Sequence, residues 1–108
     1  MSDFTDGLPI KRQLIDQVDK IFQARSPSGQ SFELTLNAVE DHVSTDLHEN
    51  FSVFFSGPID MPKEQAVYSL ENEIMVSFDV FLVPVGIDSE KLRLEAVFNH
   101  IREHSPQK

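Results

Sequence analysis

The chain has 108 residues and a formal net charge of −9, with 18 Asp and Glu against 9 Lys and Arg, and it contains no Cys and no Trp. The missing cysteines exclude disulfides, zinc–thiolate sites and thiol catalysis, and the charge opposes binding to nucleic acid and to anionic membranes. The length predicts a single domain over residues 1–108, with an ordered core from about residue 14 to about residue 102.

The sequence shows no sign of export or of membrane insertion. Residues 1–9 carry Asp3 and Asp6, without the basic and apolar segments of a signal peptide. The longest apolar run, residues 80–85, is far shorter than the roughly 20 residues that cross a bilayer. We therefore expect a cytoplasmic protein, and the absence of Cys fits a reducing compartment.

The first predicted element is a short amphipathic helix over residues 10–22. Leu14, Val18 and Ile21 recur there at helical spacing. Residues 20–25 fit a strand equally well, because Ile and Phe favour extended structure. A turn at residues 26–29 would then join this segment to a next strand as a hairpin.

The clearest strand signal lies in residues 31–38. Phe32, Leu34, Leu36 and Ala38 alternate with polar residues, which places all four side chains on one face of a strand. Residues 40–50 form a polar connection with four acidic side chains. This acidic loop is either simply solvated or a recognition surface, since long loops on rigid scaffolds often carry binding.

Four further strands follow along the chain. They are predicted over residues 51–56, 65–70, 74–85 and 92–98, with turns at residues 57–58, 71–73 and 86–90 and a loop at residues 60–63. The large core residues are expected to be Phe51, Phe55, Phe78, Phe81 and Phe98. Pro84 has no N–H, so it should lie at a sheet edge or a bulge.

About six strands joined by short turns, without alternating helices, define the expected fold class. It is mainly β: an antiparallel sandwich or small barrel of about six strands with one short N-terminal helix. Phe54, Phe81 and Val83 add apolar side chains on the second face of their strands. We expect either cover from within the chain, by the helix or another sheet, or a surface for self-association.

Four segments, in this order, resemble a family of small bacterial proteins: FSVFFSGP at residues 51–58, YSL at 68–70, FLVPVG at 81–86 and EAVFN at 95–99. The resemblance covers roughly residues 14–102, and Leu94 departs from it where the family often has Tyr. Such proteins are often encoded near phage-tail-collar-like proteins. The resemblance therefore implies a shared fold and an accessory role in a phage-tail-like assembly, without naming site residues.

Candidate metal ligands are few. His100 and His104 would share a metal only on a helix, and the spacing supplies no third ligand. His42 and His48 lie in the acidic loop, which lacks the ligand order of an EF-hand. The sequence therefore predicts no metal site, no cofactor and no catalytic residue.

Asp79 interrupts an apolar strand, so it is either an acid–base group or, with Ser77, part of the solvent face of a sheet. We expect a non-enzymatic structural or protein-interaction module that binds a protein partner or itself, without nucleic acid or membrane. The alternative is a ligand-binding or enzymatic β-barrel with its site at the mouth. Convergence of Tyr68, Ser77 and Asp79 in one cavity would favour that alternative.

Overall fold

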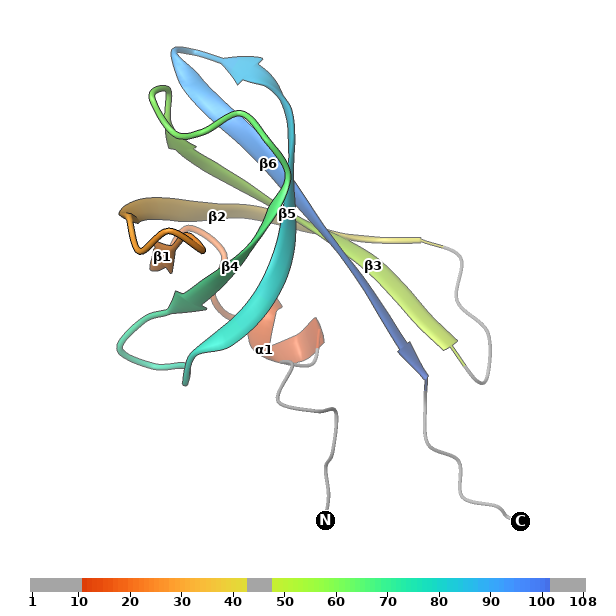
Figure 1. The fold of residues 1–108 in the computed structure, drawn as a ribbon. Helices are drawn as coiled ribbons and strands as arrows, with labels where there is room; N and C mark the ends of the chain where they lie inside the picture. Colours follow the sequence, from red (N-terminus) through yellow and green to blue (C-terminus); the bar gives the residue numbers. More distant parts are fainter. Residues whose placement is uncertain (1–10, 43–47, 102–108) are drawn as a thin grey trace, which may run out of the picture.

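The protein forms a closed β-barrel preceded by one short helix, as a computed structural model that describes residues 11–42 and 48–101 shows (Figure 1). The elements are α1 (Lys11–Ile15), β1 (Ile21–Arg25), β2 (Ser31–Asp41), β3 (His48–Pro58), β4 (Ala66–Glu71), β5 (Phe78–Asp88) and β6 (Lys91–Ile101). The strands close in the order β1-β2-β3-β6-β5-β4, and every pairing is antiparallel. The predicted fold class is confirmed, as a barrel rather than a sandwich.

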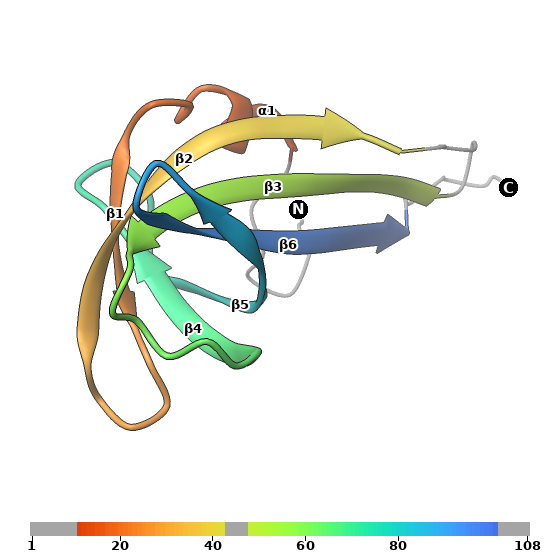
Figure 2. The same ribbon diagram turned by 90° about the horizontal axis from the view of Figure 1, so that it is seen from above.

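The number of paired residues differs widely between neighbouring strands of the barrel. β3 and β6 are paired at eleven positions, and with β2 they run alongside one another (Figure 2). β1 and β4 meet at three positions only, Gln23↔Glu71, Ala24↔Leu70 and Arg25↔Ser69. This short β1–β4 pairing closes the cylinder.

The helix is shorter than its sequence pattern predicts. It ends at Ile15, a turn follows, and residues 21–25 are a strand. Asp19 adopts a left-handed φ of 73°, and its N–H donates to the carbonyl of Leu36 over 2.7 Å. Of the two predictions for this segment, the strand paired with β2 as a hairpin is confirmed. The helix through residue 22 is wrong, because hydrogen bonds to β2 replace those of a continuing helix.

The observed β5, Phe78–Asp88, begins and ends later than the strand predicted over residues 74–85. Residues 74–77 precede the strand, because the N–H groups of Ile74 and Met75 both donate to the Asn72 side-chain oxygen, at 2.9 and 2.8 Å. At its other end β5 continues past Gly86 to Asp88. Ser89 and Glu90 then make a tight hairpin turn with φ values of 53° and 66°, as two-residue hairpins require.

A β-bulge changes the predicted face of β2. Leu34 and Leu36 point into the core, but the register shifts between Leu36 and Ala38, so Asn37 has no partner on β3. Ala38 then lies opposite Phe54 on the outer face. The expectation that Ala38 shares the core face is wrong, since one extra residue inverts the alternation beyond it.

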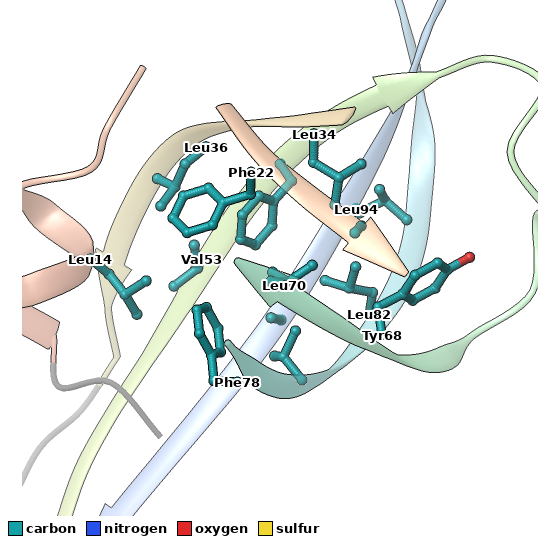
Figure 3. Close-up of a cluster of buried hydrophobic side chains, with 14 of the residues drawn as sticks. Leu14, Phe22, Leu34, Leu36, Val53, Tyr68, Leu70, Phe78, Leu82 and Leu94 are labelled. Carbon is teal, nitrogen blue, oxygen red and sulfur yellow. The ribbon is translucent and has the colours of Figure 1, made fainter. Parts of the chain in front are cut away.

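The interior is filled with apolar side chains (Figure 3). Phe22 makes edge-on contacts with Phe55 and Phe78, with ring centroids 6.0 and 6.2 Å apart. Leu14 from α1 lies at one end of the cluster and Tyr68 at the other (Figure 3). The barrel therefore has a packed core in place of a lumen.

Most predicted core positions are confirmed, with one exception. Phe51, Phe55, Phe78 and Phe98 are buried, whereas Phe81 is 48% exposed on the outside of β5. The expectation of cover from within the chain is therefore wrong for Phe81, and Phe54 is only half-buried.

Pro84 borders a register shift in the β5–β6 ladder, which confirms its predicted place at a bulge. No helix within residues 11–42 and 48–101 has the length and apolar character to span a bilayer.

Candidate functional site

The residues predicted as possible metal ligands do not form a site in the described part of the chain. His100 lies in β6 with its backbone paired to Glu49, so the helical spacing that would align it with His104 is absent there. His104 and the middle of the acidic loop, residues 43–47, lie outside the described residues. Asp41 forms an ion pair with Lys11. Residues 11–42 and 48–101 contain no group of three His, Asp or Glu side chains placed to hold a metal.

Tyr68, Ser77 and Asp79 do not converge. The Tyr68 ring is buried in the core, and this burial raises the pKa of its phenol. Ser77 and Asp79 are exposed outside the barrel, where Asp79 pairs with Ser69 and lines a depression of about 280 Å³ together with Arg25. The reading of Asp79 as part of the solvent face is confirmed.

A chain of three polar side chains crosses the outer face of β3 next to the end of β2. The Ser52 hydroxyl donates to Glu95 Oε2 over 2.6 Å and lies 2.6 Å from His42 Nε2. Since the hydroxyl proton goes to Glu95, Nε2 is the donor to Ser52 Oγ. A serine nucleophile needs the histidine between itself and the carboxylate. Here the fully buried serine is in the middle, so the chain ties strands together and does not activate a nucleophile.

A second polar feature lies between two β-bulges. A depression of about 260 Å³ is lined by Asn37, Ser56, Asp88, Ser89, Lys91 and Arg93. Asn37 is the extra residue of the β2 bulge, and Arg93 pairs with Gly86 at the β5 bulge. Bulges commonly re-aim side chains beside binding sites. Both irregularities of the barrel that the register records therefore border one depression.

Arg93 is the residue of this depression whose polar groups are least satisfied. Its Nε is buried and has no hydrogen-bond partner among the described residues. Its Nη1 lies 3.6 Å from Asp88 Oδ2, which is too long for a normal hydrogen bond. With Lys91 beside it, the depression carries two positive charges against one negative, although the chain as a whole is strongly acidic.

Sequence reasoning missed both polar features. His42 directly follows β2, Ser52 lies in β3 and Glu95 in β6, and only the pairing of these strands joins them. The one available signal for the Arg93 depression was the Pro84-Val85-Gly86 segment, which indicates a bulge without indicating what lies opposite. Both polar features can bind polar groups through hydrogen bonds and charge.

The fold and its surface define the class: a small, closed antiparallel β-barrel domain with a packed interior and polar features on its outer face. The chain belongs to the family described as Domain of unknown function (DUF6916), which matches residues 12–98. The coarse expectation of a family of small domains over this stretch is thereby confirmed. Neither curated proteins nor solved structures gave a match.

Proposed function

We propose that this barrel is a non-enzymatic protein-interaction module that binds its partner through an outer apolar patch formed by Val67, Phe81 and Val83. Val67 of β4 lies directly opposite Phe81 of β5, and Val83 follows on the same face. Val67 and Phe81 are 49% and 48% exposed. An exposed aromatic ring flanked by β-branched side chains is the feature that carries the proposal, because aromatic anchors dominate binding energy at protein interfaces.

The packed core supports a binding role over a catalytic one. Eighteen apolar side chains fill the described interior, so a ligand has no lumen to enter. Tyr68 is buried in the core whereas Ser77 and Asp79 are exposed outside the barrel, so the convergence that would favour a site at the barrel mouth does not occur. The alternative of an enzymatic or ligand-binding barrel mouth thus has less support.

The charges around the patch indicate the chemistry of the partner. Asp79 precedes Phe81 on the same face of β5, and Glu95 lies opposite Val83 on β6. Arg25 lines a depression together with Val67 and Asp79, so two carboxylates and one cation border the patch. A second copy of the chain would bring two molecules together that each carry a net charge of −9, and this repulsion opposes self-association. A protein with an apolar face and a basic rim fits the patch better.

The resemblance to proteins encoded near phage-tail-collar-like proteins supplies the first partners to try. An accessory role in a phage-tail-like assembly would present such a surface to a larger structural protein. The products of neighbouring genes are therefore the defined candidates for binding.

The test compares two single substitutions in binding to purified products of neighbouring genes. Phe81→Ser should weaken binding about tenfold or more, as expected for an interface anchor. Ile74→Ser is the matched control, since Ile74 is equally apolar and 75% exposed but lies on the β4–β5 loop. Equal binding by both variants would refute the assignment of the patch. Native mass measurement showing a stable dimer that Phe81→Ser dissociates would refute the choice of a different protein as partner.

A further inference from the structure

We infer that the depression around Arg93 is a binding site for a carboxylate group. Its elements are a guanidinium with an unpaired buried donor, a second cation at Lys91, and neutral side chains at Asn37, Ser56 and Ser89. The Ser89 hydroxyl donates to Asp88 over 3.4 Å, so Asn37 and Ser56 are the neutral donors for a ligand. This inference does not depend on the apolar patch.

The state of Arg93 is the first argument. A buried N–H without a partner loses its hydrogen bonds to water and gains none in return, so natural structures rarely keep one without a reason. The guanidinium is partly buried, with 35% of its side chain exposed, and the nearest carboxylate is held too far away to be a good acceptor. A ligand carboxylate would complete the hydrogen bonding that the protein leaves open, because guanidinium and carboxylate match as a two-pronged pair.

The backbone around Arg93 is the second argument. Ser56 lies opposite Arg93 on β3, and Gly86 lies opposite it on β5. The position facing Arg93 on β5 therefore has no side chain, and the bulge there bends the strand. Asn37, the extra residue on β2, lies on the far side of Ser56. The β2 bulge thus contributes the Asn37 amide to the lining of the depression, and the β5 bulge leaves the position opposite Arg93 without a side chain.

Asp88 and Arg93 should affect anion binding in opposite directions, because their charges are opposite. This carboxylate is 66% exposed at the β5–β6 hairpin, at 3.6 Å from Arg93 Nη1. It is the resident anion of the depression, and it repels an incoming one. Removing its charge should strengthen binding, whereas removing the charge of Arg93 should weaken it.

The experiment follows the Arg side-chain Nε–Hε signals of the full chain by NMR, at constant ionic strength, during titration with acetate. The expected result is a saturable shift of the Arg93 signal together with the Ser56 and Asn37 amides. Arg93→Gln should weaken acetate binding about tenfold or more, the loss expected for charge-assisted hydrogen bonds. Asp88→Asn should tighten it. Arg93→Lys keeps the positive charge but removes the paired N–H donors of the guanidinium, so this variant should also bind acetate more weakly.

Arg25→Gln is the matched control, because it removes the same charge from an outward strand position at the depression that contains Asp79. It should leave acetate binding unchanged. No shift at Arg93, an equal effect of Arg25→Gln and Arg93→Gln, or equal binding of sulfate would overturn the assignment. If acetate does not bind at Arg93 while Phe81→Ser still weakens partner binding, the carboxylate site is refuted and the proposed protein interaction stands. If acetate binds at Arg93 while Phe81→Ser has no effect on partner binding, the proposed interaction is refuted and the carboxylate site stands.

Two further arms distinguish the source of the carboxylate. A short peptide with a free C-terminal carboxylate is compared with the same peptide amidated. Tighter binding of the acid than of both acetate and the amide identifies a protein terminus as the ligand. Equal binding of the peptide acid and acetate identifies a small free carboxylate.

Discussion

A side chain at Gly57 would meet two buried core side chains, so Gly57→Ala should destabilise the barrel. A Cβ at this position would lie 2.6 Å from Leu34 Cδ2 and 2.7 Å from Met61 Sδ. Carbon contacts normally form at about 3.5–4.0 Å, so each neighbour would have to move by roughly 1 Å. Leu34 and Met61 are both fully buried, and overpacking of this kind costs about 1–3 kcal/mol.

The sign of the change in the free energy of unfolding distinguishes a steric effect of Gly57→Ala from a backbone effect. Where the native backbone suits alanine, replacing glycine by alanine stabilises by about 0.4–1 kcal/mol through the unfolded chain. We expect a net loss of about 1–2 kcal/mol in the free energy of unfolding. In a domain of this size each kcal/mol lowers the melting temperature by about 4–8 °C.

Urea denaturation with an unchanged m-value is the measurement, and Met61→Ala provides the internal control. Alone, that substitution should cost about 2–5 kcal/mol. Combined with Gly57→Ala it should cost less than the sum, because the alanine methyl fills space that Met61 vacates. A Gly57→Ala variant as stable as the parent, or strict additivity of the two changes, would refute the steric explanation.

Three further outcomes follow from buried groups. Phe22→Ala should lower the free energy of unfolding by about 3–5 kcal/mol in urea denaturation, because it removes both edge-on ring contacts at 6.0 and 6.2 Å; a smaller loss than 1 kcal/mol would mean that the core collapses around the gap. Ser52→Ala should cost about 1 kcal/mol by the same measurement, since it separates His42 from Glu95, both of which retain access to water. The chain has one Tyr and no Trp, so its phenolate absorbance reports on Tyr68 alone. Burial raises the pKa of this phenol above 10.0 in the folded state, so its contribution to stability is complete below that pH and is lost as pH rises through the folded-state pKa; titration at the ordinary value would contradict the buried position.

Strand alternation in the sequence predicted much of the fold because it reports burial directly. In β3 and β6 the predicted core residues Phe51, Phe55 and Phe98 are buried. The prediction failed where tertiary hydrogen bonds compete with local pattern. The Asn72 side chain holds residues 74 and 75 in a turn, and hydrogen bonds to β2 end the helical segment.

The candidate sites were beyond sequence reasoning for a different reason. Ser52 and Glu95 are 43 residues apart and meet only because β3 and β6 pair in one particular register. The surroundings of Arg93 depend on a bulge in β2 and another in β5. A bulge shifts register by one residue, and propensities along a single strand do not determine where it falls.

The short β1–β4 pairing has a consequence for how the protein behaves in concentrated solution. With three paired positions against eleven between β3 and β6, it is where the cylinder opens most readily into a curved sheet with two free edges. Free edges recruit strands from other molecules, and charged side chains along an edge discourage this. Arg25 and Glu71 stand at the two ends of the pairing. We expect their joint replacement by Val to leave the closed barrel folded while increasing its rate of aggregation.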